Sequence, residues 1–125
     1  MNEELQISKR SKYGYDIVDI RGELSFKELE GVEEFLQANV AEDTKNVILN
    51  LAEVPFINSS ALALIVKLMQ DFGSRGVELF LMNPNETVRG LFEMTGVKKY
   101  FKFIKSEESL VEKRKVEDLD DMLEL

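Results

Sequence analysis

The sequence predicts a single α/β domain whose mostly parallel sheet has four to five strands, with helices packed mainly on one face. Short runs rich in β-branched residues alternate along the chain with longer stretches at helical spacing. Such alternation favours parallel strands joined by right-handed crossovers. The 125 residues, 44% hydrophobic and 32% charged, are enough for one packed core and too few for two.

The predicted elements follow the order β-β-α-β-α-β-α-β-α. Residues 5–10 and 15–21 are predicted strands, with a turn at 13–14 between them. Ser25, with Glu28 three residues later, has the capping-box pattern, so a helix is expected to begin there. Further strands are predicted at residues 46–51, 77–82 and 100–104. The other helices are expected over 59–72, ended by Gly73, over 86–95, ended by Gly96, and after Ser106.

The strand patterns also indicate which residues share a face. Alternate apolar positions of three strands are expected to be buried together in one sheet: Val18, Ile20, Val47, Leu49, Leu51, Val77, Leu79 and Leu81. The opposite face carries Asn50 and Glu78 and is expected to be more polar. One face should therefore be covered by helices while the other is partly wet.

Composition excludes several classes of function. The chain has no cysteine and no histidine, so thiolate metal sites, disulfides and the common general base are missing. We expect neither a metal nor a cofactor. The net charge of −8 argues against nucleic acid. The longest apolar stretch, residues 61–66, is far short of a membrane span, and no signal peptide is seen, so a cytoplasmic protein is expected.

The negative charge is concentrated at the C-terminus, where the last nine residues hold five acids and no base. We therefore divide the chain into a domain over residues 1–112 and an acidic tail over 113–125. The tail's apolar residues fall at helical spacing. Two interpretations stay open, a solvated tail that aids solubility and a partner-binding or autoinhibitory segment.

Segment 56–62 (FINSSAL) places two hydroxyls, Ser59 and Ser60, at a predicted strand-to-helix junction. Free backbone N–H groups and the helix dipole favour an anion there, so a phosphate on Ser59 would be well placed. The ordinary alternative is that Asn58 and the serines only cap the helix.

Four segments in register resemble the STAS domain family of anti-sigma-factor antagonists. They are residues 20–24 (IRGEL), 47–51 (VILNL), 56–62 (FINSSAL), and Asn83-Pro84 followed by 88–96 (VRGLFEMTG). The resemblance runs from about Leu5 to Val111. It implies a single STAS-type domain that binds a serine-kinase anti-sigma factor, or a related protein, and is released when a loop serine is phosphorylated.

The resemblance implies that Ser59, the first serine of the pair, is the phosphoacceptor. Three positions depart from the family pattern: Asn58 replaces the loop aspartate, Ala61 the loop glycine, and Ser25 the aspartate after the Gly-Glu-Leu turn. Ser25 joins the candidate partner-binding residues. The partner is therefore expected to be a different or diverged kinase. The alternative is an unphosphorylated STAS scaffold or interaction subunit of a larger signalling or transporter assembly.

The predicted helix after this loop carries a second apolar row beside its core-facing stripe. Leu64, Leu68 and Phe72 form that row. It is either part of a wide core face or an exposed docking surface beside Ser59, and in the second case at least two of the three side chains should be exposed. Self-association into a homodimer through this row also stays open.

An enzyme is the rival class, and the sequence gives it little support. Segment 21–24 (RGEL) is too poor in glycine and hydroxyls to be a phosphate loop. Glu53 is the one acid close to the end of the 46–51 strand, which falls short of the acid cluster of a receiver domain. We therefore expect a binding protein and not an enzyme.

Overall fold

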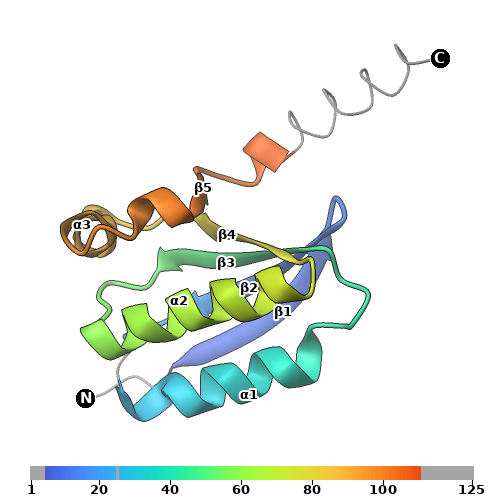
Figure 1. Cartoon of the computed structure of the whole chain (residues 1–125), viewed down its shortest axis with the longest axis horizontal. Helices are drawn as coiled ribbons and strands as arrows, with labels where there is room; N and C mark the ends of the chain where they lie inside the picture. Colours follow the sequence, from blue (N-terminus) through green and yellow to red (C-terminus); the bar gives the residue numbers. More distant parts are fainter. Residues whose placement is uncertain (1–4, 25, 111–125) are drawn as a thin grey trace.

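The computed structural model describes residues 5–24 and 26–110, and within them a five-stranded sheet has the order β1-β2-β3-β4-β5 (Figure 1). β1 and β2 form an antiparallel hairpin, whereas β2 to β5 run parallel. The strands are β1 (Gln6–Lys12), β2 (Tyr15–Arg21), β3 (Asn46–Glu53), β4 (Glu78–Met82) and β5 (Lys102–Ile104). The α-helices are α1 (Leu29–Asn39), α2 (Ser59–Ser74) and α3 (Glu86–Met94), and residues 108–110 are also helical.

The structure confirms the predicted fold class, and β3 lies in the middle of the sheet. All eight residues predicted for the shared face are buried. The hairpin turn is made by Tyr13 and Gly14, with φ of 55° and 82°. Two consecutive left-handed residues match the twist of the flanking strands, which explains why β2 begins at Tyr15 as predicted.

Several element ends differ from the prediction. α2 continues past Gly73 to Ser74, and the left-handed glycine that ends it is Gly76, with φ of 75°. Phe72 is buried near the end of α2, so packing outweighs the low helix propensity of Gly73. α1 is preceded by a 3₁₀ helix over Phe26–Glu28, while Ser25 itself lies outside the described residues. Another 3₁₀ helix, Lys98–Tyr100, shortens the last predicted strand.

The larger core lies between one face of the sheet and the three α-helices. Figure 1 shows α1 and α2 side by side on this face. The helices contribute nine buried apolar side chains: Val32, Leu36, Ala61, Leu62, Ile65, Leu68, Phe72, Val88 and Phe92. We call this the front face.

The opposite or back face is more polar than the front face only at its margin, so the prediction of a polar face is wrong at its centre. Its centre is a second apolar cluster: Tyr15, Ile17, Ile48, Phe80, Met82 and Leu110. Tyr15 and Phe80 meet edge to face with ring centroids 5.7 Å apart. Leu110, from the helical residues after β5, covers this cluster, so both faces of the central strands are buried.

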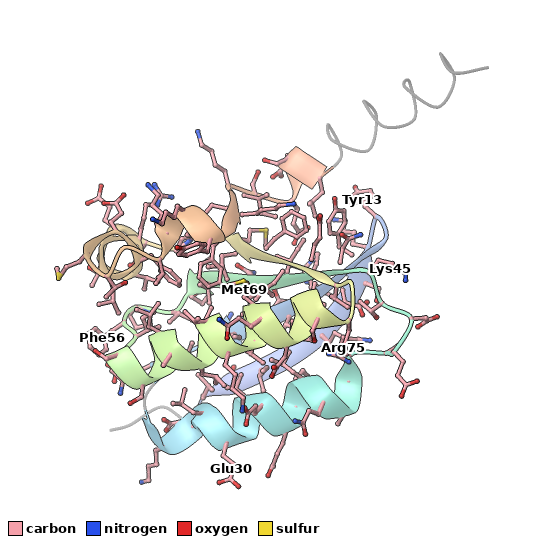
Figure 2. All side chains as sticks on the ribbon, in the orientation of Figure 1. Tyr13, Glu30, Lys45, Phe56, Met69 and Arg75 are labelled. Atoms are coloured by element: carbon pink, nitrogen blue, oxygen red, sulfur yellow. The ribbon has the colours of Figure 1, made fainter. Side chains whose placement is uncertain are left out.

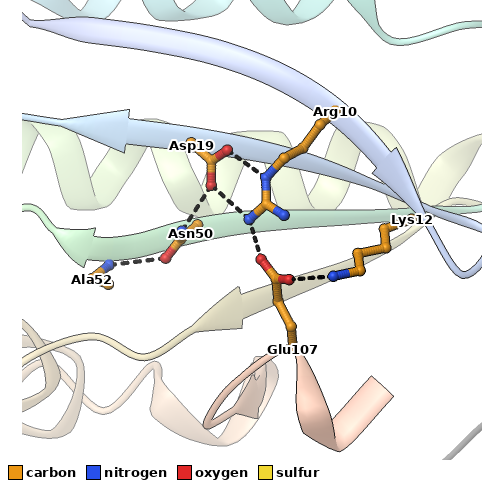
Figure 3. A network of polar contacts seen from close by, with 6 residues as sticks. All are labelled: Arg10, Lys12, Asp19, Asn50, Ala52 and Glu107. Carbon is orange, nitrogen blue, oxygen red and sulfur yellow. Dashed lines mark hydrogen bonds and ion pairs between the residues drawn. The ribbon is translucent and has the colours of Figure 1, made fainter. Parts of the chain in front are cut away.

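Polar side chains are confined to the margin of the back face, where they form the network in Figure 3. The Arg10 guanidinium donates to both Asp19 carboxylate oxygens, at 2.7 and 3.1 Å, and Asn50 Nδ2 donates to Asp19 at 2.7 Å. Arg10 also pairs with Glu107, whose other oxygen lies 3.0 Å from Lys12 Nζ. These cations lower the pKa of the Asp19 and Glu107 carboxyls. The network joins the segment after β5 to the β1–β2 hairpin.

Candidate functional site

Ser59 is the first residue of α2, directly after the loop that leaves β3. Asn58 is the N-cap: its Oδ1 accepts from the Ala61 N–H at 2.8 Å, and its backbone oxygen accepts from the Leu62 N–H at 3.0 Å. Asn58 therefore supplies the side-chain cap, and Ser59, Ser60 and Ala61 all lie inside the first turn. Ala61 is helical and needs no left-handed backbone at the position where the family has glycine.

The hydroxyl groups of Ser59 and Ser60 both face solvent. Within residues 5–24 and 26–110, neither hydroxyl forms a hydrogen bond, because the cap is supplied by Asn58. A phosphate on Ser59 would stand at the positive end of a 16-residue helix dipole. The geometry thus presents a hydroxyl that the fold does not use.

Two neighbouring segments hold the Ser59 loop in place. Leu24, in the turn after β2, forms a parallel bridge with Ile57, and its N–H donates to the Phe56 carbonyl at 3.3 Å. The Gly22 N–H donates to the Glu53 carbonyl at 3.1 Å, with Gly22 at a φ of 111° that favours glycine. The turn over residues 22–24 is therefore a support for the loop.

Asn85 supports the loop from the other side, and sequence reasoning missed it. Its Nδ2 donates to the Pro55 carbonyl at 3.2 Å and to the Val54 carbonyl at 3.4 Å. Its Oδ1 accepts from the Val88 N–H at 2.8 Å and so caps α3. An asparagine before a predicted helix signals the cap, but nothing local signals the bond to a loop 30 residues earlier.

Phe56 is a second residue that the sequence analysis did not single out. Its side chain is 49% exposed, three residues before Ser59, and Figure 2 shows it at the N-terminal end of α2. An aromatic ring in a loop that faces solvent offers an apolar anchor for a partner. The signal in the sequence was an aromatic residue after Pro55, between a strand and a helix.

Of the two interpretations of the second apolar row, the docking surface is wrong for Leu68 and Phe72, which are 6% and 3% exposed and belong to a wide core face. α2 packs against the sheet and also lies beside α1, whose Leu36 is in the same cluster. The second apolar row is covered for that reason. Leu64 is half-buried beside Leu29 and is the one member of the row left for a partner.

The described residues contain neither a membrane-spanning helix nor a metal-binding cluster. None of their helices has both the length and the apolar character needed to cross a bilayer. Their acidic side chains form no group of three that could hold a metal ion, and the chain has neither histidine nor cysteine.

The fold and the position of this loop are those of a STAS-type domain, and the comparisons with known proteins agree. The sequence model of the STAS domain matches residues 6–110, so the chain belongs to the STAS domain family. Within the family it is like the anti-sigma-factor antagonists. An anti-sigma-B factor antagonist of Staphylococcus aureus is 28% identical over 98 residues, which cover 78% of this chain and 89% of that protein.

Solved structures show the same fold. A putative anti-sigma factor antagonist from Thermotoga maritima has a TM-score of 0.77 at 19% identity, over 86% of this chain and 92% of that one. Phosphorylated SpoIIAA of Bacillus has a TM-score of 0.65 at 19% identity, over 88% and 98%. The murine solute carrier 26 family member A9 anion transporter has a TM-score of 0.70 at 21% identity, over 82% of this chain and 18% of the transporter.

Proposed function

We propose that this chain is a cytoplasmic, non-enzymatic regulator that binds a serine-kinase anti-sigma factor and is switched by phosphorylation of Ser59. One observation carries the proposal: the Ser59 hydroxyl is exposed at the start of a capped helix, beside the exposed ring of Phe56. Membership in the STAS domain family and similarity to anti-sigma-B factor antagonists support it.

The switch has a simple physical basis. A phosphate adds a charge of roughly −1.5 to −2. The N-terminus of α2 stabilises that charge by about 0.3–1 kcal/mol, so the fold should tolerate it. A partner surface that packs on Phe56 and is apolar or acidic around Ser59 should not tolerate it, because burying an unpaired charge costs several kcal/mol. Phosphorylation would thus end binding without unfolding the domain.

Asn58 modifies this picture relative to the family pattern. A neutral cap leaves one negative charge fewer beside the acceptor than the family's aspartate would. The phosphorylated loop then meets less repulsion from its own cap, whereas a kinase that reads the aspartate loses a contact. We therefore expect a partner kinase that is matched to Asn58.

The test uses the full-length chain and the kinase captured with it from the native host. Ser59→Asp should stay folded and lose binding, and Ser59→Ala should bind with or without ATP. Ser60→Ala is the matched control and should keep the switch. Binding is measured by calorimetry, folding by circular dichroism, and the modified residue by mass spectrometry after incubation with ATP.

Two results would overturn the proposal. Modification of Ser60 alone would show that Ser60, and not Ser59, is the phosphoacceptor. If incubation with the kinase and ATP modified neither serine and the chain stayed bound, the result would instead favour an unphosphorylated scaffold or assembly subunit, the role suggested by the similarity to the transporter.

A further inference from the structure

Positive charge is concentrated in one segment of this acidic protein, at the edge of the sheet. Residues 94–105 hold four lysines and no acid, although the chain as a whole has a charge of −8. Six residues from the end of α3 to β5 make up what we call the lysine edge: Met94, Lys98, Lys99, Tyr100, Lys102 and Phe103. Lys102 lies on its back-face side beside Phe80, and Phe103 on its front-face side beside Phe92. β5 is the last strand of the sheet, so this surface lies at its margin.

The lysine edge is apolar as well as basic. Met94 and Tyr100 are the most exposed large apolar side chains in the described part of the chain, at 83% and 61%. The Lys99 ammonium lies 5.3 Å from the Tyr100 ring centroid. A shallow, open depression lies beside Lys98, Lys99 and Phe103, with Glu93 also in its lining. Exposed apolar groups among cations are the features that bind an acidic, amphipathic segment.

The charges of the lysine edge are only partly neutralised. Lys98 lies 2.8 Å from Glu93 and Lys102 lies 3.0 Å from Glu78. Lys99 forms no ion pair within residues 5–24 and 26–110. These pairs are exposed, so their carboxylates leave the ammonium groups free to meet further acids.

A segment with the complementary chemistry is present in the same chain. Residues 117–125 carry five acids and no base, and four apolar residues accompany the acids: Leu119, Met122, Leu123 and Leu125. The four lysines in residues 94–105 are thus matched in charge by the five acids of this acidic segment, and both segments include large apolar side chains. We propose that residues 117–125 dock on the lysine edge of their own molecule.

The position of Leu110 favours docking within one molecule over docking between copies. Leu110 is buried in the back-face cluster with Phe80, and Phe80 is the register partner of Lys102. Lys102 Nζ lies 5.7 Å from the Phe80 ring centroid. The acidic segment begins seven residues after Leu110, and that length of chain spans up to about 23 Å, several times the spacing of about 4.8 Å between strands.

The chain has no cysteine, so a single substitution gives a unique spin-label position. Leu125→Cys keeps all the tail acids. In the full-length labelled chain we expect loss of amide NMR intensity at residues 94–103. Raising the salt from about 0.15 to 1 M shortens the Debye length from about 8 to 3 Å and should restore that intensity.

A matched pair of triple variants identifies the surface that binds. Lys98→Gln, Lys99→Gln and Lys102→Gln together should abolish the intensity loss. Lys9→Gln, Lys27→Gln and Lys45→Gln change the net charge equally and should leave it intact. Circular dichroism checks that both variants fold.

Three outcomes would overturn the proposal. Full amide NMR intensity at residues 94–103 in the spin-labelled chain would exclude docking. Intensity loss in a mixture of spin-labelled chain with isotope-labelled chain would assign the contact to a second copy. Sedimentation of the wild-type chain with phosphatidylglycerol vesicles, without any intensity loss in their absence, would make the lysine edge a membrane-binding surface. The readout does not involve Ser59, so it is independent of the proposed switch.

Discussion

The front and back faces of the sheet are buried by different means. The front face is covered by α1, α2 and α3, whose inward side chains form one continuous apolar cluster with the strands. The back face has an apolar centre but an ionic margin, and its cover begins with the segment that contains Glu107 and Leu110. The front face is thus a packed core, whereas the back face is an apolar patch held at its margin by ion pairs.

This difference follows from connectivity. The front-face helices are the crossovers between parallel strands, so each packs close to the strands it joins. The back face is closed by a contact between residues 95 apart, Lys12 and Glu107. A cover that does not connect two strands of the described sheet should be easier to disturb than three helices that each connect two strands, and the predictions below test this.

The largest effect is expected in the front-face core. Phe92 is fully buried, with Phe101 and Phe103 edge to face at centroid distances of 5.2 and 5.8 Å. Phe92→Ala removes a ring that neighbours on three elements enclose, and should lower the free energy of unfolding by about 3–5 kcal/mol. Urea denaturation measures it. Met94→Ala, on the same helix but exposed, should change stability by less than about 0.5 kcal/mol.

An intermediate effect is expected at Leu110 on the back face. Leu110→Ala should cost about 2 kcal/mol, the low end for a buried leucine, because residues 108–110 can shift toward the space left behind. The chain has no tryptophan, so tyrosine fluorescence reports the loss of cover over Tyr15. If Leu110→Ala lowered the free energy of unfolding, measured by urea denaturation, as much as Phe92→Ala does, the two faces would be equally rigid. The comparison between them would then fail.

The sequence predicted the front face well because its signals are local. Alternation in β2 and β3, helical spacing in α1 to α3 and capping residues all act within a few positions. The back face was misjudged from Asn50 and Glu78. Asn50 belongs to the polar margin and Glu78 to the first position of β4, whereas Ile48 and Phe80 share that face and are buried. Their apolar runs were the signal of burial on both sides.

The candidate site could likewise be predicted only where its signals are local in the sequence. The position of Ser59 at the start of α2 could be predicted, because a helix N-terminus is encoded in a few neighbouring residues. The burial of Leu68 and Phe72 could not, since it depends on how α1 lies against α2. The support of the loop by Asn85 also depends on a contact between two distant turns.

The smallest effect is expected from the ionic margin of the back face. Glu107→Gln removes the ion pairs with Arg10 and Lys12, and exposed pairs of this kind contribute about 0.2–1 kcal/mol. Hydrogen bonds from Arg10, then from Lys12, lower the pKa of Glu107 in the folded state. Its stabilisation is therefore fully present above the unfolded-state pKa of about 4.3 and is lost as the pH falls through the lower folded-state value.

The stability difference between the wild type and Glu107→Gln should thus be largest near neutral pH, shrink in acid, and shrink in high salt. Urea denaturation at several pH values measures it. Glu34→Gln is the control, because Glu34 is an exposed residue of α1 that forms no ion pair in the described part of the chain. If Glu107→Gln lowered the free energy of unfolding as much as Leu110→Ala does, and by the same amount at every pH, Glu107 would act through packing. The back face would then be a second core and not a patch fastened by charge.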